Sequence, residues 1–255
     1  METVKGFKDV EGSEALKQLE IKKRIAEIFE LYGFEVVETP IIEYEEFVKG
    51  QNQDDEAVSD VFKLKDKGNR DLALRYEFTF QLKRLAVNKK LPYKRYQIGP
   101  VVRDEPVSPG RCRQVTQCDL DIIGSSVKDE AELLSMAKFI LKEFGIKFKI
   151  YINNRKLLNS ILDKSGIKNN KKEVIKELDK LDKLSEDQIK LNLKKLKVSE
   201  LEIKSLFNSF KKTNTLEWFE KNGFEGASEL KELKKYLNFY GVDFEFSPSL
   251  ARGLS

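Results

Sequence analysis

The chain has 255 residues, of which 40% are hydrophobic and 35% charged, and its formal net charge is +4. This composition is typical of a globular protein with a charged surface, and no apolar run approaches the roughly 18 residues of a membrane span. No apolar signal region follows Met1, so we expect a cytoplasmic protein. With no histidine and two cysteines, the sequence excludes His-containing metal sites, histidine-dependent nucleophile pairs and a closed four-ligand zinc site within the chain.

The first predicted element is an amphipathic helix that Ser13 can cap. Gly33 suits the left-handed residue that ends such a helix. Residues 34–44 then read as extended chain, broken at Pro40. The apolar stripe of the helix consists of Ile21, Ile25, Ile28, Phe29 and Tyr32.

Two β-hairpins are predicted next. In the first, residues 61–65 and 71–77 flank a turn-rich connection. The second covers residues 96–124, with Pro106, Pro109 and Gly110 in its turn. Along its return arm, one face receives Arg111, Arg113, Val115, Gln117, Asp119 and Asp121, and the other receives Cys112, Cys118, Leu120 and Ile122. We expect both thiols to be reduced and buried.

The remaining chain is mostly helical. A helix over residues 128–144 and a strand over residues 146–152 precede a stretch rich in Lys, Glu and Leu, in which Ser185 and Gln188 have the form of a capping box. Extended chain returns after residue 242. The pattern predicts an α+β architecture, an antiparallel β-sheet with flanking helices, interrupted by an all-helical subdomain. The predicted division is a core of residues 1–153, an insertion of residues 154–240, and a return to the core over residues 241–255.

A row of arginines and acidic side chains on the second hairpin is the feature that carries chemistry. Each arginine presents a planar fork of donors that matches phosphate or carboxylate groups. Interleaved with acids, these arginines indicate a floor that binds an anion and a cation together, as a zwitterionic amino acid and a nucleotide require. A solvated lattice of salt bridges explains the same residues, and both interpretations remain open. The row comprises Arg103, Glu105, Arg111, Arg113, Gln117 and Asp121.

Five stretches, in order along the chain, resemble class II aminoacyl-tRNA synthetases, and among them the histidyl-tRNA synthetase family. Residues 32–41 resemble motif 1, residues 74–79 the amino-acid-binding strand, and residues 96–114 motif 2. Residues 117–122 resemble the eukaryotic and archaeal-like branch of the family, and residues 249–254 the start of its histidyl signature. The resemblance implies the N-terminal catalytic portion of such an enzyme, which would attach histidine to tRNA(His) with ATP and Mg²⁺.

The same resemblance implies roles for individual residues. Arg103 would contact the ATP α-phosphate and the substrate carboxylate, with Arg252 across the α-phosphate from it. The resemblance places ATP against Glu105, Arg111 and Arg113, and histidine against Glu77, Thr79, Gln117 and Asp121. It assigns no residue to a metal site. Activation is an in-line attack of a carboxylate on phosphorus, which needs positioning and charge stabilisation rather than a protein nucleophile.

The sequence also departs from the family pattern. It ends at Ser255, inside the histidyl signature and before motif 3, and Val102, Cys112 and Val115 stand where aromatic residues are usual. We expect a fragment, or one half of a split enzyme that works with a separate C-terminal polypeptide. Two alternatives stay open: a catalytically silent regulatory subunit of ATP phosphoribosyltransferase that resembles the histidyl enzyme, and a non-enzymatic tRNA-binding module.

Partners follow from the same resemblance. The lysine-rich insertion would pack on the acceptor arm of tRNA, although the interleaved acidic residues equally fit a solvated helix surface. Motif 1 implies a homodimer.

Overall fold

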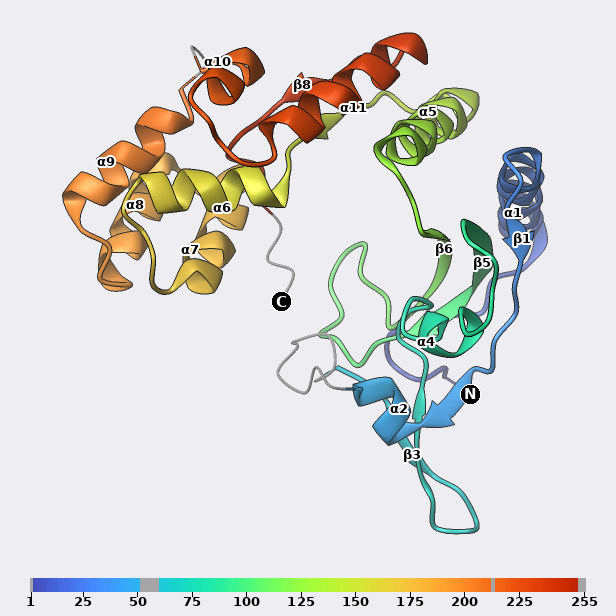
Figure 1. Cartoon of the computed structure of the whole chain (residues 1–255). Helices are drawn as coiled ribbons and strands as arrows, with labels where there is room; N and C mark the ends of the chain where they lie inside the picture. Colours follow the sequence, from blue (N-terminus) through green and yellow to red (C-terminus); the bar gives the residue numbers. More distant parts are fainter. Residues whose placement is uncertain (1, 51–59, 212–213, 252–255) are drawn as a thin grey trace. The chain divides into compact units, whose positions relative to one another are not determined.

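The computed structural model describes residues 2–50, 60–211 and 214–251 (Figure 1). Contacts divide the chain into two compact units, Met1–Ser125 and Ser126–Ser255, called here the N-terminal unit and the C-terminal unit. The N-terminal unit contains α1 (Gly12–Leu31), β1 (Glu35–Val36), β2 (Ile42–Tyr44), α2 (Glu45–Lys49), β3 (Lys63–Lys65), β4 (Asp71–Leu74), α4 (Leu82–Leu85), β5 (Tyr93–Val102) and β6 (Gln114–Ile123).

Two small sheets organise the N-terminal unit. One has the order β1-β5-β6, in which β5 and β6 form the long antiparallel hairpin and β1 lies parallel to β5. The other has the order β2-β4-β3 and is antiparallel throughout. This second sheet confirms the first predicted hairpin, although its strand ends at Leu74 rather than at Glu77.

Helix α1 packs on the long hairpin through its apolar stripe. Ile28 and Phe29 are buried, and the Phe29 ring lies 5.3 Å from that of Tyr96, centroid to centroid. The helix begins at Gly12, behind Glu11, without a side-chain cap, so the cap predicted at Ser13 is wrong. Helix initiation here follows from packing of the stripe and not from a capping hydrogen bond.

The C-terminal unit is helical apart from one short strand pair. Its elements are α5 (Val127–Glu143), β7 (Tyr151–Ile152), α6 (Arg155–Lys164), α7 (Lys171–Leu178), the 3₁₀ turn η1 (Asp179–Asp182), α8 (Glu186–Lys195), α9 (Glu200–Ser209), α10 (Leu216–Lys221), α11 (Ala227–Phe239) and β8 (Glu245–Phe246). Ser185 Oγ accepts a hydrogen bond of 3.3 Å from the Gln188 amide, so Ser185 caps α8. The Gln188 side chain donates to Asn192 Oδ1, and only the Ser185 half of the predicted capping box is formed.

The strands β7 and β8 pair in parallel and bring residues 151–152 beside residues 245–246. The chain between them leaves and returns to one place, as an insertion does. The compact units nevertheless divide after Ser125, so α5 and β7, which the predicted core of residues 1–153 includes, belong with the helices. The physical reason is that Ala131 and Ile152 are buried in the same apolar core as α6 and α11. The boundaries of the insertion stay a prediction.

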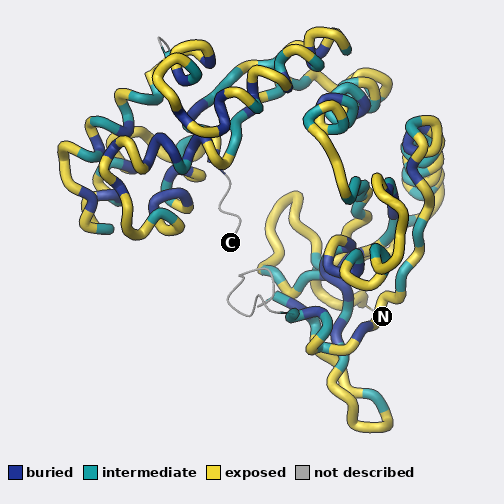
Figure 2. Tube along the Cα trace, viewed as in Figure 1, coloured by how far each residue is buried: buried dark blue, intermediate teal, exposed yellow. Residues whose placement is uncertain are grey.

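Figure 2 shows burial along the trace. The expectation that both cysteines are buried is wrong. Cys112 and Cys118 are free, but both are exposed. They line a cavity of about 380 Å³ together with Lys8 and Lys22, on the side of the hairpin that faces the start of the chain. The cavity leaves this face of the hairpin open to solvent. Side chains that alternate onto it from β6, such as Cys118, are therefore not buried. None of the helices in the described ranges combines the length and apolar character that crossing a membrane requires.

Candidate active site

One face of the β5–β6 hairpin is polar along most of its length. Opposed residues of an antiparallel pair project to the same side, and the register sets Arg95 against Asp121, Gln97 against Asp119, and Gly99 against Gln117. We call these six residues the polar face. The predicted alternation is therefore confirmed from Val115 to Asp121. Arg111 and Arg113 precede β6, so strand alternation does not govern where their side chains point.

The segment that follows β4 lies against this polar face. The Val102 amide donates to the Arg75 carbonyl oxygen at 3.0 Å. Arg103 Nε donates to the Tyr76 carbonyl oxygen, also at 3.0 Å. These bonds place Glu77 over the hairpin, and its carboxylate accepts a hydrogen bond of 3.2 Å from the Phe80 amide.

The electrostatics of Glu77 show what it faces. Burial raises the pKa of this carboxyl group above its usual value; Asp119 and Asp121 raise it further, whereas the Phe80 amide and Arg103 oppose the rise. Glu77 therefore lies among the charged groups of the polar face. Thr79, two residues further on, is exposed.

Arg103 joins this group through a second nitrogen of its guanidinium, Nη2. Its Nη2 donates to Gln117 Oε1 at 2.8 Å, and Gln117 Nε2 donates to Asp119 Oδ2 at 2.9 Å. The predicted site residues Arg103, Gln117, Glu77 and Asp121 thus converge, although they come from three separate segments. A guanidinium beside acidic groups can receive the carboxylate and the ammonium of one amino acid.

Two members of this group, Arg95 and Asp119, were not among the predicted site residues. Arg95 is fully buried and forms an ion pair with Asp121, which is one-quarter exposed. Burial raises the pKa of Asp121, with Arg95 acting to lower it and Asp119 to raise it. The signal was present: Arg95 and Gln97 alternate with Tyr96 and Ile98 on the outgoing arm, as the polar residues do on the return arm.

The remaining predicted ATP ligands form a second group in the hairpin loop. Arg113 Nη2 lies 3.0 Å from Asp104 Oδ1, and Arg113 Nε donates to the Glu105 carbonyl oxygen at 3.2 Å. Arg111 Nη1 lies 3.7 Å from Glu105 Oε2, with the Arg111 side chain largely exposed. Carboxylates and a backbone carbonyl oxygen therefore fix the two arginines of the loop. The interpretation of these residues as a solvated lattice of salt bridges predicts the same contacts. Arg252 lies outside the described residues.

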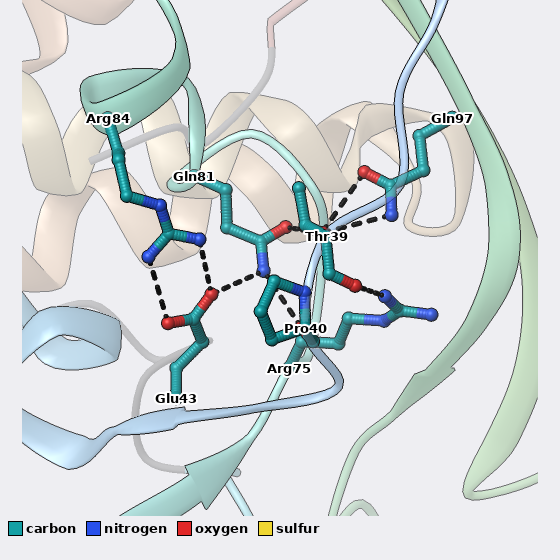
Figure 3. A network of polar contacts seen from close by, with 7 residues as sticks. All are labelled: Thr39, Pro40, Glu43, Arg75, Gln81, Arg84 and Gln97. Carbon is teal, nitrogen blue, oxygen red and sulfur yellow. Dashed lines mark hydrogen bonds and ion pairs between the residues drawn. The ribbon is translucent and has the colours of Figure 1, made fainter.

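A buried polar network meets the polar face at Gln97 (Figure 3). Gln97 Nε2 donates to Thr39 Oγ1 at 3.0 Å, and Thr39 Oγ1 donates to Gln81 Oε1 at 2.5 Å. Gln81 Nε2 donates to Glu43 Oε1 at 3.0 Å, and Arg84 donates to both carboxylate oxygens of Glu43. Residues near the motif 1 resemblance are in this way connected to the strand that carries the site.

Arg75 completes the support. Its Nη1 donates to the Thr39 carbonyl oxygen at 2.6 Å and its Nε to the Pro100 carbonyl oxygen at 2.9 Å. A Cβ atom on Gly99 would come within 3.1 Å of Arg75 Nη2, so glycine at this position leaves room for the guanidinium. Within the described part of the chain, no three His, Cys, Asp or Glu side chains are grouped to hold a metal ion.

Comparison with known proteins shows the family of the chain. A family model described as "Histidyl-tRNA synthetase" matches residues 6–255. A histidine–tRNA ligase 1 of Bacillus cereus is 37% identical over the whole chain, and the histidine–tRNA ligase of Wolinella succinogenes is 36% identical over 99% of it. The chain spans 64% and 62% of these two curated relatives.

Solved structures give the same fold. A histidyl-tRNA synthetase from Nostoc superposes on 99% of the chain with a TM-score of 0.84 at 25% identity, and the chain covers 62% of that structure. An "ATP phosphoribosyltransferase regulatory subunit/histidyl-tRNA synthetase" from Bacillus halodurans superposes on 98% with a TM-score of 0.81 at 20% identity, and 68% of it is covered. These likenesses confirm the predicted α+β, class II synthetase-like architecture.

The relatives also correct one expectation. They are bacterial, which supports a bacterial branch rather than the eukaryotic and archaeal-like branch predicted from residues 117–122. Since the family model covers nearly the whole length, this chain belongs to the histidyl-tRNA synthetase family.

Proposed function

We propose that this chain is the catalytic portion of a cytoplasmic histidine–tRNA ligase, which activates histidine with ATP and transfers it to tRNA(His). The observation that carries the proposal is the convergence of Glu77, Arg103, Gln117 and Asp121 on one face of the β5–β6 hairpin. The zwitterionic substrate would set its carboxylate at Arg103 and its ammonium at Glu77, with Thr79 beside it. Gln117 and Asp121 would line the imidazole pocket.

Activation needs little protein chemistry beyond this placement. The histidine carboxylate attacks the α-phosphorus of ATP in line, a P–O bond forms, and the bond to the departing pyrophosphate breaks. Arg103, with Arg252 opposite, would stabilise the negative charge that develops on the α-phosphate. Glu105, Arg111 and Arg113 would hold the rest of ATP, and Mg²⁺ would arrive on the ATP phosphates rather than in a protein cage.

Binding of tRNA by the helical C-terminal unit is a further part of the proposal. Lys180, Lys190 and Lys194 already pair with acidic neighbours on the same surface, which supports the solvated alternative as well. Phosphate contacts release counterions, so affinity driven by lysines falls steeply as salt rises. Measuring tRNA(His) binding between 50 and about 200 mM salt separates the alternatives, because salt-independent affinity would exclude a lysine-driven contact.

We also propose a homodimer formed through the motif 1 region. Large apolar side chains stay exposed on and after α1, where a monomer gains nothing from them. They include Leu31, Val36, Ile41, Ile42 and Tyr44. A Val36→Glu variant should shift the protein towards monomer in sedimentation velocity, because a charge cannot be buried in an apolar contact without a large desolvation cost. A species of unchanged mass at every concentration would contradict this interface.

The likeness to the Bacillus halodurans structure keeps a regulatory subunit of ATP phosphoribosyltransferase as the alternative. Titration of histidine into the chain, followed by pyrophosphate exchange with and without the C-terminal segment that the relatives carry, tests both readings. Exchange that appears only on complementation supports the ligase split over two polypeptides. Absence of exchange, together with binding to a phosphoribosyltransferase, supports the regulator. Absence of exchange with tRNA(His) still bound supports a non-enzymatic binding module.

A further inference from the structure

We propose that Arg95 is a positioning residue that sets the distance between the two ends of the histidine site, an inference that rests on the proposed function. Arg95 cannot meet the substrate itself, because its side chain has no exposed surface. It acts through two neighbours on opposite sides of the site. One is the carboxylate of Asp121, and the other is the backbone of the segment that carries Glu77 and Thr79.

The geometry places Arg95 between these two segments. Its Nη2 donates to the Phe78 carbonyl oxygen at 3.1 Å, midway between Glu77 and Thr79. The same guanidinium forms the ion pair with Asp121, the residue directly opposite on β6. One rigid, planar group therefore ties the strand proposed to bind the imidazole to the segment proposed to bind the ammonium. Its reach sets the length of amino acid that fits between them.

Burying the charged side chain of Arg95 costs folding free energy, which indicates a role beyond packing. Its Nε and Nη1 find no hydrogen-bond partner among the described residues. A buried charge with unsatisfied donors destabilises a fold, and an apolar side chain of similar size is often the more stable choice. The neighbouring Gln97 is also buried, but its Nε2 donates to Thr39 Oγ1.

Charge gives Arg95 a second effect on the same carboxylate. The groups that face Asp121 are Arg95 from β5, Asp119 from its own strand, and Glu77 from the crossing segment, with Arg103 beside Glu77. Burial favours the protonated form of Asp121, Arg95 opposes it, and Asp119 favours it. Without Arg95, Asp121 would take up a proton at a higher pH and would lose its attraction for a polar or cationic imidazole.

The test is isothermal titration of histidine into the chain from about pH 4 to about pH 8, a range that begins near the usual carboxyl pKa and extends above it. Arg95→Met should bind histidine more weakly at every pH, and on acidification its affinity should fall at a higher pH than that of the parent chain, because Arg95 opposes protonation of Asp121. Free histidine titrates identically in every experiment, and variants at position 121 show how much of the remaining difference belongs to the Asp121 carboxyl group.

Three variants make the result specific. Arg95→Met combined with Asp121→Asn should lose the added pH dependence, because no carboxyl group remains at position 121. Arg95→Lys keeps the charge, so its pH profile should stay close to that of the parent chain while its affinity falls. Arg75→Met is the matched control: Arg75 is also buried and stacks on Phe78, but its hydrogen-bond acceptors are backbone oxygens.

The inference is overturned if Arg95→Met follows the pH profile of the parent chain, or if Arg75→Met reproduces the Arg95→Met profile. If Arg95→Met does not fold, an Arg95→Lys variant with unchanged affinity overturns it equally. Failure of the parent chain to bind histidine at all would be a different result, since it removes the proposed function before Arg95 is tested.

Discussion

The two compact units fill their interiors with different side chains, although both are heavily charged outside. In the C-terminal unit, the buried residues that the structure describes are almost all aliphatic or aromatic, with Ser160 and Ser165 as polar members. In the N-terminal unit, the buried set includes charged and amide side chains, namely Glu43, Arg75, Gln81, Arg95 and Gln97. Figure 2 shows both interiors as dark segments of the trace, and the chemical difference lies in which residues these are.

This difference reflects what each unit has to hold. Packing alone stabilises a helical unit, and its ion pairs stay on the surface, where they contribute little. A site for a charged ligand needs oriented charges, and their desolvation has to be offset by hydrogen bonds and partners. Of these buried residues, Arg95 and Gln97 belong to the polar face, and hydrogen bonds around Thr39 connect the other three to Gln97. The following predictions test this contrast, from the largest expected effect to the smallest.

Truncation in the apolar core should cost the most stability. Phe219 is fully buried and its ring contacts Trp218, Phe224 and Phe246. Phe219→Ala should lower the free energy of unfolding of the helical unit by about 3–5 kcal/mol, through lost burial and a cavity. Urea denaturation followed by far-ultraviolet circular dichroism measures it. Leu201→Ala, at an exposed position on α9, should change little; equal effects would refute the assignment of the core.

Removal of a site arginine should abolish function and leave the fold intact. Arg103→Ala should slow pyrophosphate exchange of the completed enzyme by a factor equivalent to about 3–4 kcal/mol in the transition state. Histidine affinity should also fall, because Arg103 Nη2 positions Gln117. The control is Arg70→Ala, which removes an exposed arginine paired with Asp66 in the β3–β4 turn. An unchanged exchange rate in Arg103→Ala would remove the carboxylate and phosphate role of Arg103.

The buried carboxylate of Glu43 should give a pH-dependent contribution to stability. Burial favours its neutral form, but hydrogen bonds from Arg84 and Gln81 outweigh burial and lower the pKa below 4.5. A lowered pKa stabilises the fold above the unfolded value, and this stabilisation is lost as the pH falls through the folded value. Glu43→Gln should therefore cost about 1–3 kcal/mol at pH 7. The difference from the parent chain, measured by urea denaturation, should shrink below pH 4.5. A difference that persists at low pH would mean that charge is not the cause.

An exposed carboxylate of the C-terminal unit, that of Glu217, should contribute much less to stability than the buried Glu43. A hydrogen bond from Lys234 is the main reason that the pKa of Glu217 falls to about 2, yet more than half of the Glu217 side chain is exposed. Solvent and salt screen such a pair, so Glu217→Gln should cost no more than about 1 kcal/mol at pH 7. High salt should erase even that cost. A loss as large as that of Glu43→Gln would contradict the contrast between the two interiors.

Local patterns predicted most of the elements. The apolar stripe from Ile21 to Tyr32, the cap at Ser185 and the alternation from Val115 to Asp121 were all readable, because each depends on neighbours close in sequence. The burial expected for Cys112 and Cys118, as reduced thiols of a cytosolic protein, was wrong, and only the tertiary structure shows that a cavity lies against them. The missed residues, Arg95 and Asp119, were visible as polar alternation but had no assigned partner.

The sequence by itself determined the two faces of the hairpin, the helices of the second unit and the motifs that resemble histidyl-tRNA synthetases. Periodicity and motif order are properties of the chain, so they needed no coordinates. Only the tertiary structure decided that the segment after β4 lies over the polar face, with Glu77 among Arg103, Asp119 and Asp121, and that Arg95 is buried against Asp121. Those contacts join residues 26 to 44 positions apart in the chain, and no local rule of periodicity reaches so far.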